Sequence, residues 1–200
     1  MSLVPLNQPE SMRIVARMKK SGWILAFLLS AALPAAAQHN EFGVLLGGSK
    51  ALKSVAGRGS FERGMREIYY GISLDPGTVF KVKLGRMDAN TAFNTGQKDA
   101  TGKDIYVRDP NGSIEHVDGI LEYRFSEAYG YTGLFAGAGL YRQHGNGHDE
   151  TDYGFQGGIN SLFPISRRYA FQLEGAYHVM NFNRPRPRYL TLGAGLRIAF

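Results

Sequence analysis

Residues 189–200 read Tyr-Leu-Thr-Leu-Gly-Ala-Gly-Leu-Arg-Ile-Ala-Phe, and this stretch decides the fold class. Every second residue from Leu190 to Phe200 is apolar, whereas the residues between them are mostly small or polar. Successive side chains of a β-strand point to opposite faces, so a period of two residues indicates a strand with one apolar and one polar face. The chain therefore ends in an amphipathic strand.

The same period of two recurs from Glu41 onward, with almost no sustained helical periodicity. The facing of one segment stays open, because Gly133, Gly137 and Gly139 interrupt its alternation. We expect eight strands, at 42–48, 67–74, 79–86, 114–125, 131–142, 153–163, 169–181 and 189–200.

The connections between these segments alternate in length. Long polar stretches are expected at 49–63, 88–112 and 143–152, and short turns at 75–78, 126–130 and 164–168. Membrane barrels have this asymmetry, with short periplasmic turns and longer external loops. We therefore expect the long stretches, together with the connection 181–188, at the cell surface.

The N-terminal residues have the three parts of an export signal. Lys19 and Lys20 precede an apolar run at 23–33, and Ala35-Ala36-Ala37 offers small residues for cleavage. The run is too short for a membrane-spanning helix, which needs about 20 apolar residues.

Two parts of the chain follow from this signal. We interpret residues 1–37 as an upstream extension plus signal peptide, with Met18 as the true start, and residues 38–200 as one β-barrel domain.

Composition excludes several classes of protein. The chain has no cysteine, which excludes a cysteine-linked lipid anchor, a disulfide framework and thiol catalysis. The formal net charge is +6, but residues 1–37 carry four of the 23 basic and one of the 17 acidic residues, which leaves +3. This charge is too small for a nucleic-acid-binding surface, so we expect no nucleic-acid partner.

Alternation alone does not distinguish a membrane barrel from a soluble barrel with an apolar cavity. Aromatic residues gather at the expected strand ends, as they do in the interfacial girdles of membrane barrels. They are Tyr123, Phe125, Tyr129, Tyr131, Phe163, Tyr169 and Phe200 at the end with the short turns, and Tyr141, Tyr153, Phe182 and Tyr189 at the opposite rim. The sequence therefore predicts an all-β fold, a closed antiparallel up-and-down transmembrane β-barrel of about eight strands after an N-terminal signal peptide.

The polar faces of the strands carry charges of both signs. Because an eight-stranded barrel is just wide enough for side chains to fill it, and buried charges need partners, we expect a paired, plugged interior. Its expected members are Glu67, Lys81, Lys83, His116, Asp118, Glu122, Arg124, Glu174, His178 and Arg197.

Three features resemble the small outer-membrane β-barrel family that includes the transmembrane domain of outer membrane protein A. They are the Ala35-Ala36-Ala37 export signal, the Gly-aromatic hairpin with 122–125 and 137–141, and the final stretch 196–200. The resemblance implies a bacterial outer-membrane location. It also implies that Leu196, Ile198 and Phe200 present the signal read by the outer-membrane assembly machinery, with periplasmic chaperones as further partners.

A related family, the lipid A deacylases, carries a His-x-Ser-Asn motif whose serine is the nucleophile. Here the stretch reads His178-Val179-Met180-Asn181, with Met180 in place of the serine. We therefore expect no catalytic residue. His178 is expected to be an interior histidine beside Glu174.

Two polar stretches could bind ligands. Alternating prolines hold Arg184, Arg186 and Arg188 in one stiff segment that suits lipopolysaccharide phosphates, although a rigid loop with solvated charges explains it equally well. The residues His144, His148, Asp149, Glu150 and Asp152 match no strict metal-ligand spacing. We expect a solvated loop there and no metal.

The sequence predicts a non-enzymatic, monomeric outer-membrane barrel without a cofactor, in contact with outer-membrane lipids and lipopolysaccharide. Its long loops would serve envelope integrity or surface interaction. A lipid A-modifying enzyme and a narrow porin remain the alternatives.

Overall fold

The computed structural model describes residues 40–53, 63–127, 130–182 and 186–200. The expected signal peptide at 1–37, including Met18, therefore lies outside the described residues, as do Tyr129 and Arg184. The described part of the chain contains no helix that is long and apolar enough to cross a membrane. Its strands are β1 (Asn40–Lys53), β2 (Arg63–Ser73), β3 (Thr78–Asp88), β4 (Thr91–Lys98), β5 (Asp104–Asp109), β6 (Ser113–Glu127), β7 (Gly130–Gly145), β8 (His148–Pro164), β9 (Tyr169–Met180) and β10 (Arg188–Ala199).

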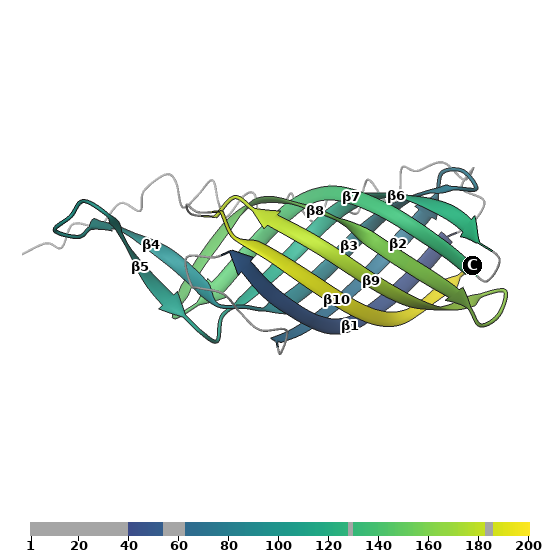
Figure 1. Cartoon of the computed structure of the whole chain (residues 1–200), viewed down its shortest axis with the longest axis horizontal. Coiled ribbons are helices and arrows are strands. Elements are labelled where there is room, and N and C mark those ends of the chain that lie inside the picture. Colours follow the sequence, from purple (N-terminus) through teal and green to yellow (C-terminus); the bar gives the residue numbers. More distant parts are fainter. Residues whose placement is uncertain (1–39, 54–62, 128–129, 183–185) are drawn as a thin grey trace, which may run out of the picture. The chain divides into compact units, whose positions relative to one another are not determined.

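Eight of these strands form a closed antiparallel barrel in the order β1-β10-β9-β8-β7-β6-β3-β2 (Figure 1). Sequential strands are neighbours throughout, except that the β4–β5 hairpin is inserted between β3 and β6. The barrel closes where β1 pairs with β10, with Val44 opposite Leu196. Backbone hydrogen bonds of 2.9 Å between Asn40 and Phe200 continue this pairing to the chain end. The predicted closed antiparallel barrel of eight strands is confirmed.

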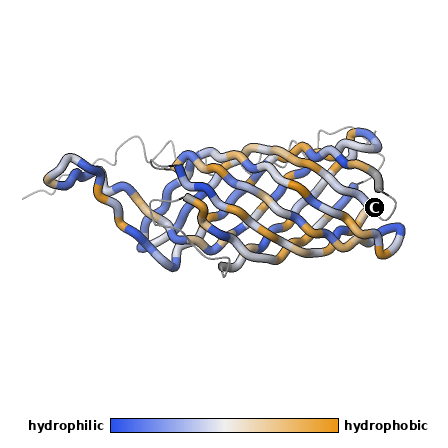
Figure 2. Tube along the Cα trace, viewed as in Figure 1, coloured by the Kyte–Doolittle hydropathy of each residue, from blue (hydrophilic) through white to orange (hydrophobic). Residues whose placement is uncertain are grey.

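Side chains alternate between the interior and the outer surface along the barrel strands. On β9, for example, Gln172 and Glu174 are buried, whereas Phe171 and Leu173 are exposed. In Figure 2, hydrophilic and hydrophobic colours recur in turn along the barrel strands. The ambiguous β7 follows the rule too, because its Phe135 points inward.

Two of the predicted long loops are wrong. The stretch 88–112 contains the β4–β5 hairpin, and 143–152 is the end of the β7–β8 hairpin, which closes in a two-residue turn. That turn consists of Asn146 and Gly147, which both have positive φ angles (47° and 75°), as tight hairpin turns require. The strands extend beyond their apolar residues into polar sequence. The alternation of polar and apolar residues does not mark them there.

The aromatic girdle predicted from the sequence is confirmed, among the described residues, for the end with the short turns. Tyr123, Phe125, Phe163, Tyr169 and Phe200 are exposed at the end with the short turns. At the opposite end only Tyr153 is exposed, whereas Tyr141, Phe182 and Tyr189 are buried. The two tyrosines occupy inward-facing positions of their strands, and for these residues the girdle prediction is wrong.

Candidate functional site

Two groups of charged side chains meet inside the barrel. The first ion group consists of Glu41, Lys81, Glu122, Arg124 and Arg197, from β1, β3, β6 and β10. The Lys81 Nζ lies 2.5 Å from Glu122 Oε2 and 3.5 Å from Glu41 Oε1. Glu41 also accepts hydrogen bonds from Arg124 Nη2 at 2.6 Å and from Arg197 Nη1 at 3.2 Å. Arg124 also pairs with Glu122, so each carboxylate of this group faces more than one cation.

The second ion group consists of Glu67, Lys83, His116, Asp118 and Glu174, from β2, β3, β6 and β9. Lys83 pairs with Glu174, and its Nζ lies 3.1 Å from Glu67 Oε2. The Nε2 atom of His116 lies 3.4 Å from Glu67 Oε1, and Nδ1 contacts Asp118. Within the described residues, Lys83 is therefore the one lysine or arginine that pairs with Glu67 and Glu174, whereas Asp118 pairs with His116.

The charges of the two ion groups nearly cancel. Together they contain five carboxylates, four lysine or arginine side chains and His116. Both ring nitrogens of His116 face carboxylates, an arrangement that is satisfied when each nitrogen carries a proton. Mutual pairing of this kind offsets part of the cost of burying charge.

Uncharged side chains connect the two ion groups. The Lys81 Nζ lies 4.2 Å from the centroid of the Tyr69 ring, and the Tyr69 hydroxyl donates to Gln172 Oε1 at 2.5 Å. Gln172 in turn donates to Glu174 Oε2 at 3.1 Å. Tyr69, Gln172 and Glu41 were not among the residues predicted for the interior. Tyr69 and Gln172 nevertheless alternate in step with the predicted residues Glu67 and Glu174 on the same strands.

His178 lies apart from Glu174, so the expected contact between them is wrong. The ring forms hydrogen bonds of 3.1 Å with the Tyr141 hydroxyl through Nδ1 and with Thr191 Oγ1 through Nε2. Tyr141 lies on β7 and Thr191 on β10, so each ring nitrogen has a partner from a different strand. His178 and Met180 are fully buried and both face inward.

Apolar side chains fill the barrel beyond these polar groups, toward the end that carries the β4–β5 hairpin. We call them the outer cluster. Its members are Ala51, Met65, Met87, Ala89, Ile114, Tyr141, Met180, Phe182 and Tyr189, all of them buried.

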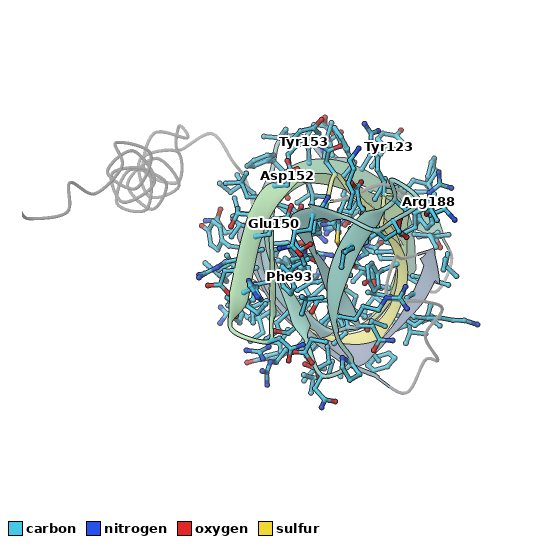
Figure 3. The ribbon with its side chains drawn as sticks, turned by 90° about the vertical axis from the view of Figure 1, so that its left-hand side faces the viewer. Phe93, Tyr123, Glu150, Asp152, Tyr153 and Arg188 are labelled. Atoms are coloured by element: carbon cyan, nitrogen blue, oxygen red, sulfur yellow. The ribbon has the colours of Figure 1, made fainter. Side chains whose placement is uncertain are left out.

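The β4–β5 hairpin is attached to the tip of the β7–β8 hairpin. Gln143 Nε2 donates to the Ala92 carbonyl at 3.2 Å, and Thr91 Oγ1 donates to the His144 carbonyl at 3.2 Å. Asn146 donates from Nδ2 to the Arg108 carbonyl at 2.7 Å. The base of the hairpin is thus held to the barrel, and Phe93 near this base lies within the outline of the barrel mouth in Figure 3.

The far part of the β4–β5 hairpin is exposed and polar (Figure 2). Asp99 orders its turn by accepting hydrogen bonds from the Thr101 hydroxyl at 2.7 Å and from the backbone N–H of Lys103 at 3.0 Å. The Thr101 hydroxyl is the main cause of a pKa of Asp99 below its usual range. This end of the hairpin is therefore structured although it is solvated.

The remaining candidate residues lie on the surface. Within the described residues, no three His, Asp or Glu side chains converge as a metal site would require. His144 instead pairs with Asp149 and, through Nε2, with Glu115 at 3.2 Å. Arg186 and Arg188 are exposed. Leu196, Ile198 and Phe200 are exposed on the outer surface of the last strand and at the chain end.

Comparison with known proteins finds similarity in structure only. No protein-family model and no curated protein matches the sequence. The crystal structure of Neisserial surface protein A is 16% identical over 81% of this chain and 97% of that chain, with a TM-score of 0.62. Ail of Yersinia pestis, in complex with the heparin analogue sucrose octasulfate, is 12% identical over 81% and 98%, with a TM-score of 0.47. The N-terminal β-barrel domain of Pseudomonas aeruginosa OprF is 11% identical over 81% and 97%, also with a TM-score of 0.47.

The chain thus has the fold of the small eight-stranded outer-membrane barrels. Its outer surface is apolar and its interior polar and charged, which is the distribution that a closed barrel in a bilayer requires. The resemblance in fold that was inferred from the sequence is confirmed.

Proposed function

We propose that this protein is a non-conducting, non-enzymatic barrel that presents the β4–β5 hairpin as a contact surface outside the cell. The observation that carries the proposal is the occupied interior. Two ion groups span it, and the outer cluster fills the end beneath the hairpin. A hydrated ion that crossed the barrel would have to displace both.

Electrical recording tests the closed interior. We expect no unitary conductance from the refolded protein in planar bilayers at high salt. A variant with Met65→Ala, Phe182→Ala and Tyr189→Ala removes three large side chains of the outer cluster and tests whether the barrel stays closed without them. Steady channels from the unaltered protein would overturn the proposal and favour the narrow porin.

The position of His178 supports a role without catalysis. The ring is buried and both its nitrogens have partners, and Met180 beside it supplies no nucleophile. Lipid A mass profiles of cells with and without the protein test this directly. We expect identical profiles, and a protein-dependent loss of an acyl chain would establish an enzyme.

The hairpin supports a role at the surface, in adhesion or envelope integrity, because its base is attached to the barrel while its tip is exposed. Replacement of residues 93–107 by an Asn-Gly turn removes the tip and leaves the barrel strands intact. We expect the shortened barrel to fold and cells that carry it to lose surface attachment or gain detergent sensitivity. Cells unchanged in both respects would refute a role for the hairpin.

A further inference from the structure

Arginine marks the outer end of the apolar surface on four barrel strands. Arg66, Arg86, Arg142 and Arg188 lie on β2, β3, β7 and β10. Each is next to a buried, inward-facing residue and therefore points away from the interior. On its strand, each follows the last outward-facing apolar side chain toward the hairpin end. We call these four residues the outer arginine ring, and Figure 3 shows Arg188 on the outer surface.

The opposite end of the barrel carries no such ring in the described residues. The outward-facing side chains there are aromatic or aliphatic, as at Phe125, Phe163 and Ile198. The arginines at that end, Arg167 and Arg168, belong to the turn between β8 and β9 and not to the wall of the barrel. Among the described side chains, the outward-facing arginines of the wall therefore lie at the end with the β4–β5 hairpin.

Two members of the ring repel one another within the fold. Arg66 is directly opposite Arg86 in the β2–β3 ladder, and like charges in this position destabilise a sheet. Arg86 is compensated by Glu115, whose Oε1 lies 3.5 Å from its Nη1, and by Asp88, whose Oδ1 lies 4.0 Å from its Nε. Within the described residues no carboxylate pairs with Arg66. Of the two arginines, Arg66 is therefore the one without an anionic partner in the described part of the chain.

We propose that Arg66 and Arg86 together bind a phosphate group of a phosphorylated lipid in the outer leaflet. Directly opposite residues on adjacent antiparallel strands have Cα atoms about 5 Å apart, so two guanidinium groups can reach one phosphate. Each offers the planar donor fork that suits phosphate oxygens. Their long stems let the charged ends reach the headgroup level from the edge of the apolar surface. The proposal requires the outer-membrane location but not a non-conducting interior.

The test is a titration of the refolded protein in neutral detergent micelles with bisphosphorylated lipid A, read by native mass spectrometry. The test variant is Arg66→Gln with Arg86→Gln, and the control is Arg167→Gln with Arg168→Gln, which removes the same charge at the other end. Migration on unboiled gels shows that each variant is folded. The single variant Arg66→Gln keeps the Arg86–Glu115 pair and serves if the double variant does not fold.

We expect the test variant to bind lipid A about tenfold more weakly, which corresponds to about 1.4 kcal/mol. The control variant should bind like the unaltered protein, and dephosphorylated lipid A should bind the unaltered protein as weakly as lipid A binds the test variant. Equal affinity of the test and control variants for lipid A would overturn the proposal. So would binding that does not depend on the phosphates.

Discussion

Replacement of Lys83 by methionine should destabilise the barrel more than any other single change of a charged interior residue. The Lys83 side chain is 1% exposed and pairs with Glu67 and Glu174. Among the described residues, its loss leaves Glu67 with His116 and Glu174 with the uncharged Gln172 amide. Removal of one partner from a buried ion pair costs about 3–5 kcal/mol, because the other charge stays buried without compensation. We expect a loss in this range.

Lys81 provides the matched control. It lies two residues away on β3, is equally buried and also contacts two carboxylates. Those carboxylates retain Arg124 when Lys81 is removed, and one of them also retains Arg197. Lys81→Met should therefore cost about 1–2 kcal/mol, since only part of the charge compensation is lost.

The free energy of unfolding can be measured by urea titration of the protein in lipid vesicles. Far-ultraviolet circular dichroism is the suitable signal, because the one tryptophan of the chain, Trp23, precedes the expected mature sequence. Combining Lys83→Met with Glu67→Gln and Glu174→Gln should restore most of the stability, because the uncompensated charge is removed. A cost for Lys83→Met equal to or below that of Lys81→Met would refute the division of the interior into two unequally supported groups.

Three further substitutions test other parts of the fold. Gly43→Ala should lower the free energy of unfolding by about 1–3 kcal/mol, because the added Cβ would lie 2.2 Å from the ring of Tyr69. Gly157→Ala, whose Cβ would have its nearest atom at 3.4 Å, should be nearly neutral in the same urea titration. Tyr141→Phe removes the hydroxyl that contacts His178 and should cost about 1 kcal/mol by that measurement. Asn146→Gly, which keeps the positive φ of the turn, should speed hydrogen exchange in β4 and β5 but not in the barrel, and unchanged exchange would show that this side chain does not anchor the hairpin.

The barrel could be predicted from the sequence because each strand buries one face and exposes the other to lipid. The period of two is strongest where both faces have fixed environments, as between Tyr169 and Met180. The charged interior could be predicted from the same alternation. Glu67, Lys83 and Glu174 each lie next to an outward-facing apolar residue of their strand and therefore face the interior.

The remaining features could not be predicted, because the alternation of polar and apolar residues does not determine them. The β4–β5 hairpin is solvated beyond its base, so no apolar face reveals its strands. Tyr141 and Tyr189 are aromatic residues near strand ends, as expected of an interfacial girdle. Only the structure shows that they point inward and belong to the outer cluster. The pairing of Arg66 with Arg86 requires the register between β2 and β3, which the sequence does not fix.

The central claim is that the apolar face of each strand meets lipid while the polar face lies inside. The chain has no cysteine, so single spin-labelled cysteines at positions 189–199 of β10, one variant at a time, can be compared in bilayers without background. We expect contact with dissolved oxygen to peak at every second position, beginning with Leu190, and contact with a water-soluble nickel reagent to stay low there. High contact of these positions with the nickel reagent would contradict the account, because it would place the apolar face away from lipid.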